Sequence, residues 1–176
     1  MKKITLFLIA NCILTIANCF SQTNIISTNP VAEQVMMGNY NPTTYLASTI
    51  LNHPDTITAG INARINADSL KAYIIKLASF KNRNTGSDTV SSQIGIGASR
   101  RWVYSKFQQF SAANENRLIP SYLQFDLAIC GIPQHKNIFA VLPGMDTTDK
   151  SIILIEGHID SRCEVLCDTA CNAQGG

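Results

Sequence analysis

One apolar run near the C-terminal end of the chain limits most strongly what it can fold into. Residues 151–156 contain four consecutive large aliphatic side chains: Ile152, Ile153, Leu154 and Ile155. A run that is this apolar and rich in β-branched residues is typical of a strand buried on both faces of an α/β sheet. In open α/β sheets, ligands bind just beyond the carboxyl ends of the strands. We therefore expect a functional site at residues 157–161, directly after this strand.

His158 and Asp160 are the residues of this stretch whose side chains suit chemistry. Because side chains alternate along a strand, two residues that are two positions apart point to the same side. His158 could bind a metal ion through one ring nitrogen while Asp160 accepts a hydrogen bond from the other, which fixes the tautomer and strengthens the ligand. The same residues also fit a polar strand end followed by an ordinary turn at residues 160–161. The spacing alone leaves both interpretations open.

Residues 1–21 are typical of a secretory signal peptide. Lys2 and Lys3 give a basic start, and residues 4–17 form an apolar core that is too short to span a bilayer. Small residues before Gln22 suit a cleavage site, so the mature chain is expected to begin there. These features predict a secreted or periplasmic protein.

Cys19 offers an alternative, in which the protein is anchored as a lipoprotein through this residue. Asn18 is a poor fit directly before a lipidated cysteine, so we favour plain export. No other stretch of the sequence has the length and apolarity of a transmembrane helix.

Charge and length restrict the class of protein. Removal of the signal peptide takes away two lysines and leaves 12 basic and 12 acidic side chains. This balance gives no electrostatic reason to favour a nucleic acid or an anionic membrane as a partner. The apolar content of 45% argues against wholesale disorder, and the length suits one domain with a hydrophobic core. We divide the mature chain into a lead-in segment at residues 22–63 and a domain at residues 64–176.

Four cysteines lie beyond the signal peptide: Cys130, Cys163, Cys167 and Cys171. In an oxidising compartment such a set usually forms disulfides, and three pairings are possible. We expect the last three to take part in disulfides, with Cys130 as a candidate partner for one of them. A zinc site is the alternative, because the last three recur every fourth residue and would share one face of a helix. They lack the usual Cys-x-x-Cys spacing, so we favour disulfides.

Two amphipathic helices are predicted in the domain. The first is capped by residues 66–68 and carries apolar residues at helical spacing: Leu70, Tyr73, Ile74, Leu77 and Ala78. Residues 82–87 are expected to end it as a loop. The second helix has an aromatic-rich stripe: Ala98, Trp102, Val103, Phe107 and Phe110. We expect both stripes to pack into the core. The lead-in segment, in which His53 and two asparagines precede prolines, predicts loops with short helical pieces.

Three strands are predicted in the second half of the chain. Residues 123–129 alternate between apolar and polar, residues 138–142 form a short apolar run before a turn, and residues 151–156 form the buried strand. Short connections predict that the first pair is antiparallel. Three strands and two helices would cover the last strand only partly, so we expect this sequence to be the front part of a larger α/β domain.

Four pieces of the sequence, taken in order, resemble a known family. They are residues 77–87, the helix around Trp102, residues 137–144 and the Glu-Gly-His-Ile-Asp-Ser segment at residues 156–161. Together they resemble the secreted co-catalytic zinc aminopeptidases of peptidase family M twenty-eight, which also contains glutamate carboxypeptidase-like enzymes and glutaminyl cyclases. The resemblance implies the front half of a mixed-sheet, three-layer α/β/α zinc-peptidase domain.

The resemblance also assigns roles to residues. It implies that His158 binds one of two zinc ions and that Asp160, counted among the catalytic residues, supports it. The family further needs a bridging Asp, a Glu pair whose first member is the general base, another Asp and a final His. None is recognisable up to Gly176, and Asp168 does not match the bridging position. A catalytic zinc usually has three protein ligands, so the chain alone is expected to be inactive.

The resemblance leaves three functions open for the complete protein. The first is a zinc aminopeptidase that removes N-terminal residues from peptides, using zinc-activated water and a Glu base. The second is a glutaminyl-cyclase-like acyltransferase, and the third is a non-catalytic binding domain. The sequence encoded after Gly176 would separate them, because an Asp-Asn step followed by a Glu pair favours the peptidase.

Overall fold

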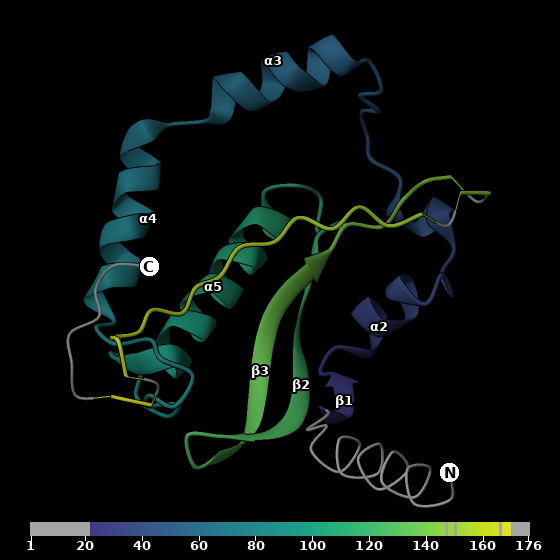
Figure 1. Cartoon of the computed structure of the whole chain (residues 1–176). Coiled ribbons are helices and arrows are strands. Elements are labelled where there is room, and N and C mark those ends of the chain that lie inside the picture. The colour runs from purple at the N-terminus through teal and green to yellow at the C-terminus, as the bar shows by residue number, and fades with distance from the viewer. Residues whose placement is uncertain (1–21, 147, 150, 166, 170–176) are drawn as a thin grey trace, which may run out of the picture.

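The computed structural model describes residues 22–146, 148–149, 151–165 and 167–169, which form a mixed α/β unit (Figure 1). Within this part of the chain there are three strands, four α-helices and one short 3-10 helix, Pro42–Tyr45. The predicted signal peptide, Cys19 and Cys171 lie outside the described residues. No helix among the described residues combines the length and apolarity needed to cross a membrane.

The sheet is antiparallel, with the strand order β1-β2-β3. It consists of β1 (Thr23–Ser27), β2 (Ile119–Ile129) and β3 (Ile132–Val141). The β2–β3 hairpin confirms the predicted antiparallel pair, and its register places Ser121 opposite Phe139 and Phe125 opposite His135. β1 was not predicted, because its five residues lie in the polar lead-in segment and all but Ser27 are exposed.

A two-residue turn joins β2 to β3. Ile129 pairs with Ile132, so Cys130 and Gly131 form the tip of the hairpin. Both have positive φ angles, 55° and 76°. Two positive φ values are the requirement of the type I′ turn, whose twist matches that of the flanking strands. Cys130 is thus placed at the hairpin tip in a backbone conformation that L-residues adopt rarely.

Helices lie on both faces of the sheet. α2 (Pro30–Met36) packs Ala32 and Val35 against Ile119, with Phe139 and Val141 beside them. α5 (Gly95–Ala112) covers the opposite face, because its Tyr104 ring stacks on Tyr122 at a centroid distance of 4.7 Å. Tyr122 alternates with Ile119 and Ser121 along β2, so its side chain points to the other side. The sheet is therefore sandwiched locally between two helices.

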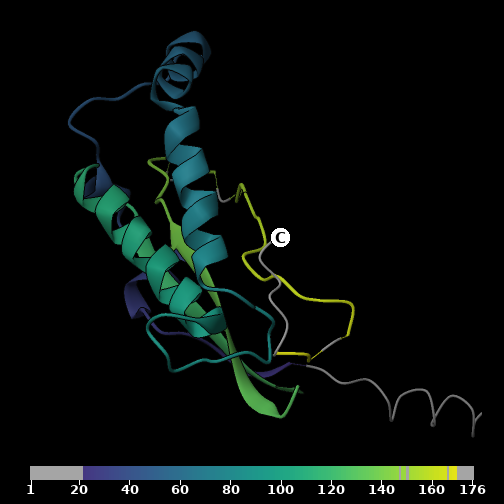
Figure 2. The same cartoon turned by 90° about the vertical axis from the view of Figure 1, so that its left-hand side faces the viewer.

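The other two helices form an arm that extends from this sandwich (Figures 1 and 2). α3 (Pro54–Arg64) begins after His53, whose ring accepts a hydrogen bond from the Asp55 N–H, and α4 (Ala67–Ser79) begins after the predicted cap Asn66. The prediction of an α-helix at α4 is confirmed. The prediction that its apolar stripe packs into the core is wrong for Leu70 and Ile74, which are exposed, whereas Tyr73, Leu77 and Ala78 of the same stripe are half-buried.

α4 meets the sandwich through Tyr73, at its middle, and through Phe80, directly after its last residue. The ring of Tyr73 meets the ring of Trp102 on α5 edge to face at 5.7 Å, and Phe80 approaches the same indole at 6.2 Å. The Lys106 ammonium lies over both the Tyr73 and Trp102 rings, at 5.4 Å and 5.9 Å from their centroids. Aromatic and cation–π contacts of this kind join α4 to the predicted stripe of α5.

The predicted buried strand at residues 151–156 is wrong for this structure. The segment follows β3 as an extended chain without strand pairing, seen as the thin yellow trace of Figure 1. Its aliphatic side chains are among the most exposed of the described residues, with Ile153 at 90% and Ile155 at 91%. A strand that is apolar on both sides needs neighbouring strands and covering helices. The described residues place neither beside this segment.

Candidate functional site

His158 and Asp160 lie together in the structure, although the segment that carries them is not a strand. His158 Nδ1 lies 3.1 Å from the backbone oxygen of Asp160 and 3.3 Å from its carboxylate Oδ1. Both side chains are accessible to solvent. Asp160 therefore holds Nδ1 of His158. When Nδ1 carries the proton, the lone pair of Nε2 is free to bind a metal ion. The predicted roles of metal ligand and supporting carboxylate remain predictions.

A buried polar loop, residues 82–87, contacts the chain directly before and after Asp160. Most of its residues are polar, yet Asn82, Arg83, Asn84 and Ser87 are each no more than 5% exposed. Polar groups can be buried at this density only when they are hydrogen-bonded. The sequence predicted a loop here but gave no sign of its burial, which depends on contacts with residues far along the chain.

Arg83 is the residue of this loop nearest to the predicted site. Its Nε donates to the backbone oxygen of Ile159 at 2.7 Å, and its Nη1 donates to the backbone oxygen of Leu77 at 2.6 Å. Its own N–H points to the Ser161 hydroxyl at 3.4 Å. Burial lowers the pKa of Arg83, and attraction to the Asp160 carboxylate offsets part of that effect. Arg83 therefore contacts the residues on both sides of Asp160.

Arg100 on α5 adds a second positive charge near Asp160. Burial lowers the pKa of Arg100, and the Tyr122 and Asp160 side chains act in the opposite direction. Arg100 is partly buried, and its charge acts on that of Asp160 in the candidate site.

Asn84 organises the loop internally. Its backbone N–H donates to Asn82 Oδ1, and its own Oδ1 accepts from the Gly86 N–H, both at 2.8 Å. The Ser87 N–H and hydroxyl both donate to the Asn84 carbonyl, at 2.8 Å and 2.6 Å. Nδ2 of Asn84 is buried and has no hydrogen-bond partner among the described residues. These bonds make the loop a compact unit that carries its own polar network.

The loop also anchors the start of α5. The Ser87 hydroxyl accepts from the Ile96 N–H at 2.9 Å, and the Asp88 carbonyl accepts from the Gly97 N–H at 3.0 Å. The first residues of a helix have N–H groups without partners in the helix. Ile94 supplies no side-chain cap, so Ser87 of the loop and the next residue, Asp88, satisfy these groups in its place. The site-bearing segment and α5 are consequently tied to the same loop.

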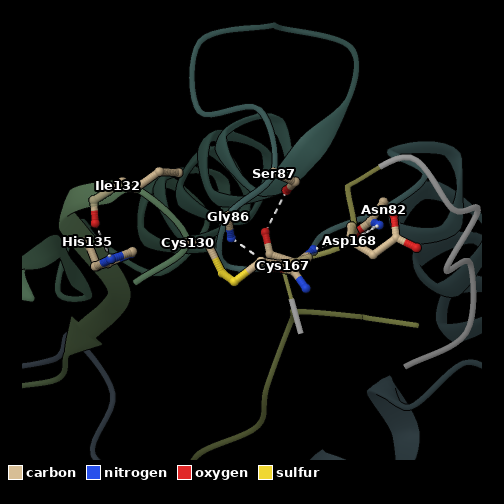
Figure 3. Close-up of a disulfide and its surroundings, with 9 residues drawn as sticks. Asn82, Gly86, Ser87, Cys130, Ile132, His135, Cys167 and Asp168 are labelled. Carbon is tan, nitrogen blue, oxygen red and sulfur yellow. Dashed lines mark hydrogen bonds between the residues drawn. A yellow bond between two sulfur atoms is a disulfide. The ribbon is translucent and has the colours of Figure 1, made fainter. Parts of the chain in front are cut away.

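A disulfide between Cys130 and Cys167 lies beside the loop at residues 82–87 (Figure 3). It joins the hairpin tip to the chain beyond Asp160, and the neighbouring Asp168 carbonyl accepts a hydrogen bond from Asn82 Nδ2 at 2.7 Å. Gly86 lies against it, since a Cβ there would be 2.3 Å from Cys130 Cβ. The predicted involvement of Cys130 and Cys167 in a disulfide is confirmed.

Cys163 is also disulfide-bonded. A disulfide sulfur does not supply the thiolate that zinc requires, so the alternative of a zinc site on Cys163, Cys167 and Cys171 is wrong for the two of these that are described. The segment is also not helical at Cys163 or Cys167, so the spacing of four does not place them on one helix face.

The donors present fit one part of a zinc site. An imidazole whose Nδ1 is held by a carboxylate and a carbonyl can bind zinc through Nε2, and such outer partners fix the ring orientation of metal-binding histidines. No group of three or more His, Cys, Asp or Glu side chains suited to a metal is found among the described residues. A catalytic zinc usually needs three protein ligands. His158 and Asp160 therefore fit zinc as one ligand and its support, without the rest of the set.

The sequence is similar to proteins named as probable zinc metalloproteases. One from Leptosphaeria maculans is 31% identical over 115 residues, which are 63% of this chain and 26% of that protein. One from Phaeosphaeria nodorum is 34% identical over 62% of this chain and 23% of that protein. One from Pyricularia oryzae is 26% identical over 69% of this chain and 25% of that protein.

The chain thus spans about a quarter of the length of these curated relatives. No family model matches the sequence, and no solved structure matches it. The similarity is therefore to proteins named for zinc-dependent proteolysis, over a limited part of their length.

Proposed function

We propose that this chain is the N-terminal part of a zinc-dependent exopeptidase, an aminopeptidase of peptidase family M twenty-eight. The observation that carries the proposal is the His158–Asp160 pair, in which a carboxylate and a carbonyl hold Nδ1. The similarity to proteins named as probable zinc metalloproteases supports a metallopeptidase and zinc. The substrates would be peptides with a free N-terminus.

The chain's own residues have limited tasks in this proposal. His158 binds one of two zinc ions through Nε2, and Asp160 keeps the ring in the tautomer that leaves Nε2 free for the metal. Zinc, when bound, supplies a Lewis acid for the scissile carbonyl and lowers the pKa of water. The bridging carboxylate, the general base and the other ligands would come from a longer protein, as the greater length of the relatives allows.

The exposed run at residues 152–155 has a place in the same proposal. In the longer protein it becomes an inner strand of an α/β sheet, because only strand neighbours and covering helices can bury aliphatic side chains on both of its faces. The site would then lie at the carboxyl end of that strand, where α/β sheets bind ligands. The 176-residue chain alone would be inactive.

We also propose export of the protein, by the signal peptide at residues 1–21. The Cys130–Cys167 disulfide supports an oxidising compartment, because disulfides persist mainly outside the cytosol. Mass spectrometry of the protein from its native host tests this proposal. We expect a mature chain that starts near Gln22; a mature chain that still carries Met1 would contradict export with cleavage.

The function is tested on the longer protein and on this chain, by metal analysis and by release of N-terminal residues from peptides. We expect zinc and activity in the longer protein, and neither in the 176-residue chain. His158→Ala should abolish activity and lower zinc content, and Asp160→Asn should weaken zinc binding or activity by about 10- to 100-fold.

His53→Ala is the matched control, because His53 is also an exposed histidine next to an aspartate but lies in the arm. It should change neither readout. Normal zinc content in the His158→Ala protein would overturn the proposal. Zinc binding with glutaminyl cyclisation in place of peptide cleavage would assign the acyltransferase function, and loss of both in a folded protein would assign a binding domain.

A further inference from the structure

We propose that Arg83 is a positioning residue that holds the His158–Asp160 turn in the shape that binds metal. The inference rests on the proposed function, because it concerns the same site. It adds a residue that lies 75 positions earlier in the sequence than His158 and comes from a loop that the sequence marks only as a turn.

The contacts of Arg83 enclose Asp160. The Ile159 carbonyl, which accepts from Arg83 Nε at 2.7 Å, lies directly between His158 and Asp160 in the chain. On the other side, the Ser161 hydroxyl is 3.4 Å from the Arg83 N–H and is itself buried. A peptide fixed before and after Asp160 restricts where the carboxylate can move. The Nδ1 contacts of His158 are made to the carboxylate and carbonyl of this same residue.

Arg83 is itself fixed by the fold. Its Nη1 donates to the Leu77 carbonyl at 2.6 Å, in the last turn of α4, and only 3% of the residue is exposed. The neighbouring loop residues are locked to one another by the Asn84 network. The guanidinium therefore connects a rigid loop to a segment that has no secondary structure of its own.

The geometry requires an arginine. Two different nitrogens of one planar group reach two carbonyls that belong to distant segments. A lysine ammonium is a single point donor on a flexible stem, so it cannot keep both bonds with the same orientation. Opposite charge adds to this arrangement, because the guanidinium and the Asp160 carboxylate attract each other. The substitution Arg83→Gln would remove both the pair of donor nitrogens and the positive charge.

The first test measures order in the metal-free 176-residue chain. Backbone hydrogen exchange of residues 158–161 should become at least about tenfold faster in Arg83→Gln, because a lost anchor raises the population of open states. Arg83→Lys should give an intermediate value. Arg101→Gln is the matched control, since Arg101 also donates to backbone carbonyls, but to those of Thr89, Val90 and Ser91 in the segment before α5. Its exchange at residues 158–161 should match that of the unchanged chain.

The second test measures metal binding in the longer protein, with Zn²⁺ competed by a chelating dye and Co²⁺ as a spectroscopic probe. Arg83→Gln should weaken Zn²⁺ binding by about 10- to 100-fold, the range expected for outer partners of a metal ligand. It should also change the visible absorption of bound Co²⁺, which reports ligand geometry. A residue that only stabilised the fold would lower the folded fraction but leave the Co²⁺ spectrum of folded molecules unchanged.

The outcomes separate the two proposals. If His158→Ala abolishes zinc binding while Arg83→Gln leaves exchange, affinity and the Co²⁺ spectrum unchanged, the role of Arg83 is overturned and the proposed function stands. If His158→Ala leaves zinc binding unchanged, the proposed function is overturned, and faster exchange in Arg83→Gln then assigns Arg83 to structure alone. Effects of both substitutions on zinc, with Arg101→Gln unchanged, support both proposals.

Discussion

The loop at residues 82–87 and the run at residues 152–155 reverse the usual relation between polarity and burial. The loop consists mostly of polar residues and is buried, whereas the run consists of aliphatic residues and is exposed. In these two regions, a residue is buried where other parts of the chain contact it, whatever its polarity. The loop finds partners in Ile159, Asp168 and the first turn of α5. The run has no strand beside it within the described part of the chain.

The energetic reason differs for the two regions. An unpaired buried polar group costs about 1–3 kcal/mol, so the loop is stable only because nearly all of its groups are bonded. An exposed aliphatic side chain forgoes about 1.5–3 kcal/mol that burial would provide. The loop is therefore complete in this structure, and the run has stabilisation still to gain from added strands. Three experiments test this difference.

The largest effect on the free energy of unfolding is expected from the disulfide that lies beside the loop. Cys130→Ser combined with Cys167→Ser releases a closed loop with a sequence separation of 37 residues. The chain-entropy treatment of such a loop predicts a loss of about 4 kcal/mol in the free energy of unfolding. Urea denaturation followed by circular dichroism measures it, with the unchanged oxidised chain as reference. A loss below about 1 kcal/mol would show that the contacts of the loop hold the segment without the disulfide.

A pair of glycines gives the next effect and compares the two regions directly. Gly86→Ala would place a Cβ 2.3 Å from Cys130 Cβ, whereas a Cβ at Gly157 meets nothing within 4 Å. Overpacking predicts a loss of about 2–3 kcal/mol for Gly86→Ala. Gly157→Ala should change the free energy of unfolding by no more than about 0.5 kcal/mol. Equal effects in the same denaturation experiment would mean that the loop is not packed as described.

The smallest effect on stability is expected in the exposed run. Ile153→Thr with Ile155→Thr replaces two side chains that are 90% and 91% exposed, so the free energy of unfolding should change by no more than about 0.5 kcal/mol each. Contiguous exposed apolar side chains promote association. Light scattering should therefore show less self-association at high protein concentration. A marked loss of stability would show that the run is already buried in the isolated chain.

Local signals in the sequence predicted most of the secondary structure. Helix α4 follows from the Asn66 cap and an apolar period, and the β2–β3 hairpin from alternation at residues 123–129. His158 and Asp160 also lie together, although the strand alternation that predicted this is absent from the described residues. These features depend on neighbours in the sequence, which is why pattern reasoning found them.

The errors and omissions concern contacts over long sequence distances. Whether residues 151–156 form a strand depends on partner strands, which a local pattern does not contain. The burial of Arg83 depends on Ile159, and the choice of Cys167 as the partner of Cys130 depends on where the hairpin tip lies. An Asn-Arg-Asn sequence in a turn is equally compatible with a solvated loop. Only the three-dimensional arrangement distinguishes these possibilities.

Trp102 is the single tryptophan of the chain, and it lies where α4 meets α5. Its indole is bordered by Tyr73 and Phe80 from the arm side and by the Lys106 ammonium. Emission excited selectively at the indole therefore comes from this one junction. A shift to longer wavelength would report that α4 has moved away and admitted water, before the sheet itself changes. The molecule thus carries a built-in optical probe of whether its arm is docked, and this probe needs no added label.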